Sequence, residues 1–280
     1  MELLPAFVGT PEVNKVYNVD ALTLLRAMPA GSVDMVLTDP PYGVHEAEWD
    51  TAPDLKALWV EITRILKPRS AVVFTAVQPF TTDLIMSNRA WFKYCWVWSK
   101  TIAGDFFNAK NKPLRKHEDI VVFSNGTTAN GSENKMQYYP QDVINEKKTH
   151  SRPYSSKFRR EAEQIISTRP NWKESYESEQ TNFPGSILHF AHGNNLTEHP
   201  NQKPVALFEY LIQTYTVQGA LVIDPFGGSG TTAVSARDTG RDYITCDIST
   251  EYCDLMNRRL SQPYTPNMFI AHGQPVADVA

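Results

Sequence analysis

The chain has 280 residues, 27 of them Lys or Arg and 31 Asp or Glu, for a formal net charge of -4. This length can bury the core of one large α/β domain with an insertion or of two modest domains, and the charge excludes a uniformly basic nucleic-acid-binding chain. Three cysteines without a CxxC spacing, no leader pattern and no apolar run of roughly 20 residues argue against disulfides, zinc and a membrane span, so we expect a soluble, cytoplasmic protein.

Apolar strands and amphipathic helices alternate through the first third of the chain. The pattern predicts strands at 14–20, 31–39 and 70–76, helices at 21–28, 52–68 and 79–88, and then two strands at 91–100 and 118–125. The nearly continuous apolar run at 70–76 is typical of a parallel strand that is covered on both faces. We therefore predict an α/β fold with a doubly wound, mostly parallel, Rossmann-like sheet.

The alternation stops near residue 126 and resumes near residue 185. Residues 126–182 are polar and short of aliphatic side chains, and they carry aromatic residues among basic ones. Residues 100–173 hold 14 Lys and Arg but only 8 Asp and Glu, whereas the remainder of the chain is acidic. A basic insertion on an acidic α/β body is typical of a nucleic-acid-binding protein, and a solvated surface loop is the alternative.

These patterns divide the chain into three predicted parts. Residues 1–125 and 183–262 form the α/β domain, residues 126–182 form an inserted recognition region, and residues 263–280 form a loose tail. The basic residues of the insertion that we expect to contact nucleic acid are Lys147, Lys148, Arg152, Lys157, Arg159 and Arg160.

The last third of the chain contains a glycine-rich turn. Helices are predicted at 203–216, 231–240 and 251–261, and strands at 220–226 and 241–248. The stretch VIDPFGGSGTT, residues 222–232, reads as a strand, an acid, a glycine loop and a helix start, which offers unpaired N–H groups to a ligand. Asp247 ends the next strand, where it can accept hydrogen bonds from ribose hydroxyls. The spacing is not GxGxxG, so the dinucleotide fingerprint is not met. With Asp224 before the loop and Asp247 after it, an adenosine-containing cofactor is favoured, and a purely structural turn is the alternative.

The stretch LTDPPYG, residues 37–43, ends a strand with an acid, two prolines and an aromatic ring. Pro40 and Pro41 make the turn rigid, and the Asp39 carboxylate and the Pro40 carbonyl are both hydrogen-bond acceptors. Beside the flat ring of Tyr42, this pair suits the exocyclic NH2 of a nucleobase. Two acceptors would stabilise the positive charge that grows on that nitrogen when it attacks a methyl group.

Together these motifs resemble the S-adenosylmethionine-dependent DNA amino-methyltransferases. The order, with TDPPYG first, a variable region next and DPFGGSGTT last, is similar to that of the permuted beta subgroup. The resemblance covers residues 14–125 and 185–261, and it includes RILKPRSAVVF, the HPNQKP run at 199–204 and EYCDLMNRRL. It implies that the insertion at 126–182 is the target-recognition region, although no motif within that region matches the family.

The resemblance also implies roles for individual residues. Asp20 would reach the adenine amine of the cofactor, Lys203 would bind its methionine carboxylate, and Asp247 would take its ribose with a shorter side chain than the usual Glu. The catalytic turn would consist of Asp39, Pro40, Pro41 and Tyr42, and the cofactor loop of Asp224, Phe226, Gly227, Gly228, Ser229, Gly230 and Thr231. We expect a structural role for His117 and core positions for the aromatic run at 91–98 and for the three cysteines.

The expected activity is site-specific methylation of the N6 amine of a flipped adenine in double-stranded DNA. The aspartate at the head of the catalytic turn favours adenine within the family, with cytosine N4 as the alternative base. The motifs also leave open an RNA or protein amide substrate and a non-catalytic nucleic-acid-binding subunit. The resemblance is compatible with a homodimer and with a restriction endonuclease as partner.

Overall fold

The computed structural model describes residues 9–43, 51–151, 175–191 and 202–263. The chain divides into two compact units, one formed by Met1–Tyr139 with Gly185–Ala280 and the other by Pro140–Pro184. Within the described ranges, no helix combines the length and apolar character that crossing a membrane requires.

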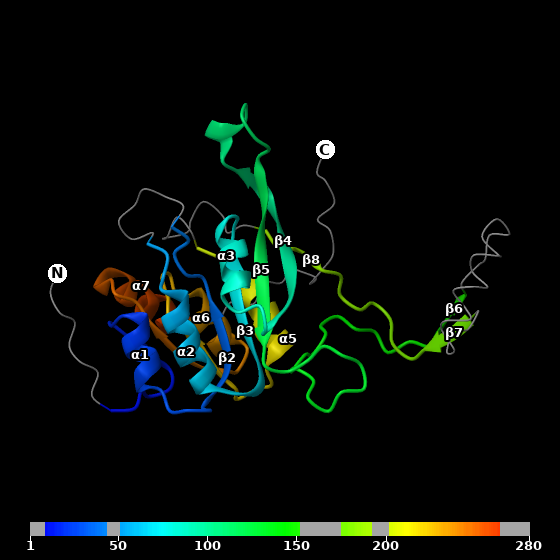
Figure 1. The fold of residues 1–280 in the computed structure, drawn as a ribbon, viewed down its shortest axis with the longest axis horizontal. Coiled ribbons are helices and arrows are strands. Elements are labelled where there is room, and N and C mark those ends of the chain that lie inside the picture. The colour runs from blue at the N-terminus through cyan, green and yellow to red at the C-terminus, as the bar shows by residue number, and fades with distance from the viewer. Residues whose placement is uncertain (1–8, 44–50, 152–174, 192–201, 264–280) are drawn as a thin grey trace. The chain divides into compact units, whose positions relative to one another are not determined.

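An eight-stranded sheet forms the centre of the larger unit (Figure 1). Five neighbouring strands are parallel, β5 is antiparallel to both of its neighbours, and β8 is parallel to β4. In spatial order the strands are β1 (Lys15–Tyr17), β10 (Asp242–Cys246), β9 (Leu221–Asp224), β2 (Val33–Thr38), β3 (Leu66–Ala76), β5 (Arg115–Ser124), β4 (Phe92–Gly104) and β8 (Ile187–His189). The predicted α/β class with a mostly parallel sheet is confirmed.

Helices cover both faces of this sheet. Alternate residues of one strand serve both cores: Val36 packs in one hydrophobic cluster, and Met35 and Leu37 pack in the other. The first cluster includes residues of α1 (Ala21–Ala27), α2 (Leu55–Ile65) and α3 (Phe80–Ser87), and the second includes residues of α5 (Val205–Tyr215) and α6 (Thr231–Asp238). The last helix is α7 (Thr250–Ser261). The sheet is thus doubly covered, as the apolar strand pattern predicts.

The spatial order of the strands in the sheet brings the two sequence motifs together. β9, which leads into the glycine loop, pairs in parallel with β2, which leads into the DPPY turn. Parallel neighbours end at the same edge of a sheet. The turn at residues 39–42 and the loop at residues 225–230 therefore lie side by side, although they are far apart in the sequence.

The boundary between α2 and β3 differs from the prediction. We expected a helix to residue 68, but α2 ends at Ile65 and β3 begins at Leu66. The reason is that Pro68 disfavours helical geometry at Lys67, which pushes the chain into an extended conformation. The register between β2 and β3 shifts at this point, and Arg69 has a left-handed φ of 66°.

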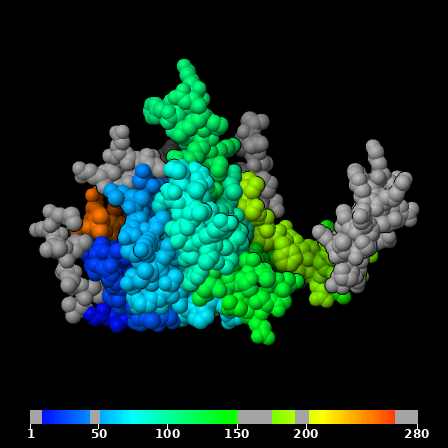
Figure 2. Space-filling model, viewed as in Figure 1, coloured from blue at the N-terminus to red at the C-terminus, as the bar shows by residue number. Residues whose placement is uncertain are grey.

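β4 and β5 extend further than the sequence pattern indicates. They form a long antiparallel hairpin that ends in a 3-10 helix, η1 (Phe106–Asn108). Figures 1 and 2 show this hairpin projecting beyond the neighbouring strands of the larger unit. The buried part of β4 contains Trp96 and Trp98, so the prediction that the aromatic run lies in the core is confirmed.

The smaller unit contains an antiparallel pair, β6 (Lys148–Ser151) and β7 (Ser175–Ser178). It begins at Pro140, later than the expected boundary at residue 126, because residues 126–139 pack with the larger unit. There the side chain of Met136 is buried and the Tyr139 amide donates to the Thr214 carbonyl over 2.7 Å. Lys147 and Lys148 are exposed, while Arg152, Lys157, Arg159, Arg160 and the tail at 264–280 lie outside the described residues.

Candidate active site

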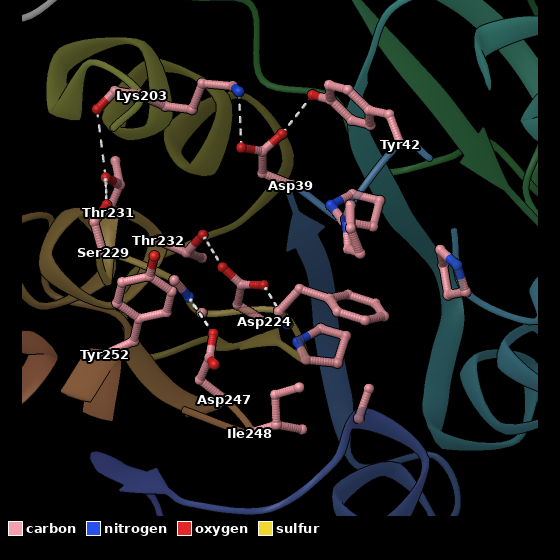
Figure 3. A pocket seen from close by; sticks show the side chains of 18 of the residues that line it. Asp39, Tyr42, Lys203, Asp224, Ser229, Thr231, Thr232, Asp247, Ile248 and Tyr252 are labelled. Atoms are coloured by element: carbon pink, nitrogen blue, oxygen red, sulfur yellow. Dashed lines mark hydrogen bonds and ion pairs between the residues drawn. The ribbon is translucent and has the colours of Figure 1, made fainter. Parts of the chain in front are cut away.

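A pocket of about 860 Å³ lies at the carboxyl edge of the parallel strands. Its walls combine the DPPY turn, the glycine loop and the residues that follow the outer strands (Figure 3). The predicted residues that line it are Asp20, Asp39, Pro40, Pro41, Tyr42, Lys203, Asp224, Phe226, Gly227, Gly228, Ser229, Thr231 and Asp247. The structure thus brings nearly all the predicted turn and cofactor residues into one cavity.

The Asp39 carboxylate is held by three donors. Its Oδ1 accepts hydrogen bonds from the Tyr42 hydroxyl, over 2.5 Å, and from the Thr75 hydroxyl. Its Oδ2 lies 2.7 Å from the Nζ atom of Lys203. Since an ionised carboxylate offers about four acceptor sites, three donors leave one site on Oδ2 for a ligand.

Lys203 is buried among negative groups. Its Nζ lies 3.4 Å from Oε2 of Glu118 as well as against Asp39, and it is 5.7 Å from the centre of the Tyr42 ring. Lys100 forms an ion pair with the other oxygen of Glu118. Two lysines and two carboxylates therefore balance one another in charge beside the DPPY turn.

Burial and these ion pairs shift the pKa values of the cluster. Burial lowers the pKa of Lys203, but the negative charges of Asp39 and Glu118 outweigh it and hold that pKa well above the ordinary value. Burial likewise raises the pKa of Glu118, and the two lysines outweigh it, so that this pKa lies below the ordinary value. Burial and then the Asp39 charge raise the pKa of Tyr42. The cluster therefore keeps Lys203 charged, Glu118 ionised and Tyr42 protonated.

Asp224 connects the glycine loop to the DPPY turn. Its Oδ1 accepts a hydrogen bond of 2.6 Å from Thr38, the residue before Asp39, and one of 3.0 Å from the Phe226 amide. Its Oδ2 accepts a 2.6 Å bond from Thr232 in the first turn of α6. Burial raises the pKa of Asp224 to about 6, despite these hydrogen bonds. Its bonds within the protein show that this residue fixes the loop.

The glycines of the loop serve different purposes. Gly228 has a φ of 50°, which L side chains rarely adopt, and Gly230 has a φ of 78°. A Cβ on Gly227 would lie 2.7 Å from Sδ of Met256, and a Cβ on Gly230 would lie 2.7 Å from its Cγ. Gly227 and Gly230 thus allow α7 to pack closely against the loop, and Gly230 does not line the pocket.

Two further carboxylates stand at the pocket beside the glycine loop. Asp247 accepts hydrogen bonds from the Gly228 amide, over 2.9 Å, and from the Ser249 amide, over 2.8 Å. Asp20 caps α1 by accepting a 3.0 Å bond from the Thr23 amide. Ile248 follows Asp247 in the pocket wall with its apolar side chain 64% exposed. Both carboxylates are fixed by backbone donors, and an apolar surface lies next to them.

Several pocket residues were not predicted from the sequence. They are Glu118, Lys100, Arg115, Ile248 and Tyr252 at the pocket wall, and Thr75, which bonds to Asp39. His117 is exposed and its neighbour Glu118 points inward, because successive residues of a strand face opposite sides. Glu118 precedes Ile120 and Val122 by two and four residues on the predicted strand and so shares their buried face, which was the one signal that could have identified it.

Comparisons with known proteins agree with this architecture. The family model described as DNA methylase, for N6 and N4 methyltransferases, matches residues 33–258. The DNA adenine methyltransferase YhdJ of Escherichia coli (strain K12) is 30% identical over 271 residues, which cover 89% of this chain and 83% of that protein. The Type II methyltransferase M1.MboII of Moraxella bovis is 24% identical over 272 residues, or 90% of this chain and 98% of that protein.

Solved structures show the same fold at lower sequence identity. The M1.HpyAVI–SAM complex has a TM-score of 0.56 and 18% identity, covering 89% of this chain and 99% of that chain. The cytosine-N4-specific PvuII DNA methyltransferase has a TM-score of 0.61 and 16% identity, covering 92% of this chain and 89% of that chain.

Proposed function

The chain belongs to the N6/N4 family of DNA methylases, and from this premise we propose that it transfers the methyl group of S-adenosylmethionine to the N6 amine of a flipped adenine in double-stranded DNA. The observation that carries the proposal is the position of the DPPY turn opposite the glycine loop in one pocket. One end of the cavity offers acceptors for an amine, and the other offers polar groups and an apolar surface for a nucleoside.

S-adenosylmethionine is the cofactor of this family, and the residues present fit it. At the carboxyl ends of β10 and β1, Asp247 and Asp20 can accept bonds from ribose hydroxyls and an adenine amine. Ile248 is an exposed apolar side chain in the pocket wall, which a flat adenine ring would cover. When bound, the cofactor supplies an electrophilic methyl group.

Asp39 and Pro40 would hold the amine of the substrate base. One acceptor site on Asp39 Oδ2 and the Pro40 carbonyl can each take one amine proton, which orients the nitrogen lone pair away from the base ring. Charge that grows on the nitrogen is stabilised by the Asp39 carboxylate, which Tyr42, Thr75 and Lys203 hold in place beforehand. Preorganisation of this kind is worth about 10² to 10³ in rate.

The basis for adenine is the aspartate at the head of the turn and the relative named as a DNA adenine methyltransferase. The runner-up is cytosine N4, since the same acceptors would hold either amine. An RNA or protein amide and a non-catalytic role are less favoured, because the acidic turn, the glycine loop and Asp247 are all intact. A homodimer and a restriction endonuclease partner stay predictions.

A transfer assay tests the proposal. The purified protein is incubated with labelled S-adenosylmethionine and unmodified double-stranded DNA, and the DNA is digested to nucleosides. We expect label in N6-methyladenine. Label in N4-methylcytosine would retain the mechanism and correct the base, while no transfer to DNA despite bound cofactor would overturn the proposal.

A further inference from the structure

The β4–β5 hairpin leaves the larger unit at the mouth of the pocket. Because β5 is antiparallel to both β3 and β4, the latter two run in the same direction, and Gly104 lies beyond the carboxyl edge where Asp39 stands. Lys100 near the end of β4 and Arg115 at the start of β5 both line the pocket. The segment 101–114 therefore begins at the pocket wall, and Figures 1 and 2 show it projecting beyond the neighbouring strands.

Two adjacent aromatic side chains stand at the tip of this hairpin. Phe106 is 77% exposed and Phe107 is fully exposed, and Ile102 on β4 is exposed as well. Exposed apolar side chains are ordinary when single, but several on one projecting segment mark an interaction surface. No described contact of the tip requires either phenyl ring, so these side chains do not serve the fold.

Hydrogen bonds and an ion pair within residues 105–112 fix the backbone of the hairpin tip. Asp105, with a left-handed φ of 69°, accepts a 2.7 Å hydrogen bond from the Asn108 side chain and forms an ion pair of 2.5 Å with Lys112. The bonds from Lys112 and Asn108 hold the pKa of Asp105 below its ordinary value. Backbone bonds from Asn108 to Asp105 and from Ala109 to Phe106, both 3.1 Å, close η1. The two rings are thus presented outward by an ordered backbone.

The charge around the tip identifies the kind of partner. Residues 100–116 contain five basic residues and one acidic residue, and that acid is already paired with Lys112. Lys110 and Lys116 are exposed. A polyanion fits this positive surface. A second copy of the chain fits it less well, because its own hairpin would carry the same positive charge even though the net charge of the chain is -4.

Resting on the proposed function, we propose that Phe106 and Phe107 insert as a wedge into the base stack of duplex DNA beside the target base, while Lys110 and Lys116 contact phosphates. Apolar side chains that enter a base step unstack it, and an aromatic ring can replace the stacking that a flipped base leaves behind. The strands that carry the wedge contribute Lys100 and Arg115 to the wall of the cavity that would receive the base, so the wedge would enter the DNA close to the flipped base.

The test compares paired and unpaired targets. The substrates are a duplex carrying the site that the wild-type protein methylates and the same duplex with an abasic position opposite the target base. For the variant Phe106→Ala/Phe107→Ala, we expect kcat/KM to fall about tenfold or more on the paired duplex, because stacking on one aromatic ring is worth that much. On the abasic duplex, where the target is already unpaired, we expect a loss of at most about threefold.

Two control variants isolate the role of the rings. Val60→Ala/Met86→Ala removes comparable apolar side chains, 60% and 61% exposed on α2 and α3, and should leave both substrates unaffected. Phe106→Tyr/Phe107→Tyr keeps the rings and should retain wild-type preference. Equal losses on both duplexes, or no loss on the paired one, would overturn the wedge while leaving the proposed methyl transfer intact.

A binding measurement separates failure of the wedge from failure of the proposed function. A wedge should bind a mixed-sequence duplex with one abasic gap more tightly than the intact duplex, whether or not methyl transfer occurs, and the alanine variant should lose this preference. If the alanine variant instead changed the oligomeric state on size exclusion and bound both duplexes as the wild type does, the aromatic pair would be a protein interface and the proposal would be wrong.

Discussion

Three donors from three parts of the chain converge on the Asp39 carboxylate. In the proposed reaction its remaining acceptor site holds the amine of the base. We expect Asp39→Ala to lower kcat by about 10² to 10³. The dissociation constant for the cofactor should change by less than about threefold, because the carboxylate contacts the amine and not the cofactor.

Single-turnover transfer and calorimetric cofactor titration measure these two quantities separately. Asp83→Ala, an exposed acid on α3, is the matched control and should leave both unchanged. Near wild-type turnover of the Asp39 variant would show that the catalytic assignment is wrong.

Lys203 has two competing roles that kinetics can separate. The family resemblance assigns it to the methionine carboxylate of the cofactor, whereas its Nζ lies 2.7 Å from Asp39 and 3.4 Å from Glu118. We expect Lys203→Met to lower kcat more than it raises the KM for S-adenosylmethionine, because loss of the buried cation leaves two carboxylates facing each other. A large rise in that KM with an unchanged kcat would instead support the carboxylate role.

At the scale of single residues, the sequence identifies those acids that end strands. Asp39, Asp224 and Asp247 follow apolar runs, and parallel strands end at a common edge, so their convergence in one pocket could be predicted. Glu118 could not be predicted in the same way. It lies inside a strand with no motif around it, and only the neighbouring strands show that it faces Lys203 and Lys100.

At the scale of elements, Asp224 at the end of β9 links β2 and the first turn of α6 through hydrogen bonds of its carboxylate. Its pKa rises from the ordinary value of 3.8 to about 6 in the folded protein because it is buried. Between pH 3.8 and about pH 6, the Asp224 carboxyl is therefore protonated in the folded state and ionised in the unfolded state. The contribution of Asp224 to stability is largest below pH 3.8 and is lost as the pH rises through 6.

Replacing Asp224 by Asn removes this titration. The difference in free energy of unfolding, variant minus wild type, should rise between pH 4 and pH 6 by at most about 3 kcal/mol and then stay level. Urea unfolding of both proteins at several pH values measures this difference. A difference that is independent of pH would show that the carboxyl does not titrate in this window.

The elements themselves follow from the sequence where a core imposes a pattern. Helix and strand positions in the α/β body could be predicted because their apolar residues recur with the period of a buried face. The β4–β5 hairpin could be predicted only as strands at 91–100 and 118–125. Between these ranges both strands extend past β3, where no core selects their side chains. The antiparallel direction of β5 likewise depends on the short connection between these strands, which is too short for a helical crossover.

For the molecule as a whole, the balance of charge separates a basic segment from an acidic body. The compact unit Pro140–Pro184 overlaps the predicted target-recognition region, and its two strands pair through Lys148 and Ser178 at one end. Composition could reveal this unit because polar, basic residues without aliphatic periodicity cannot continue the large core. It could not reveal the β6–β7 pair, since a two-stranded ladder leaves little apolar signal.

The basic residues of the insertion are predicted to bind phosphates, and salt dependence tests this at the scale of the whole protein. Each phosphate contact adds about 0.9 to the slope of log K against log salt, so six contacts would contribute about 5. Replacing the six residues by Ala should weaken duplex binding and flatten the slope towards that of the remaining contacts. The residues are Lys147, Lys148, Arg152, Lys157, Arg159 and Arg160.

The matched control for this variant removes the same charge from the larger unit. It replaces six exposed basic residues, Lys15, Arg26, Lys56, Arg89, Lys135 and Arg258. Both proteins are titrated with a fluorescent duplex at four salt concentrations. Since the two variants lose the same charge, a flatter slope in the first alone would locate the phosphate contacts in the insertion. Equal flattening in both would show that the loss of net charge accounts for the effect and that the insertion makes no special contribution.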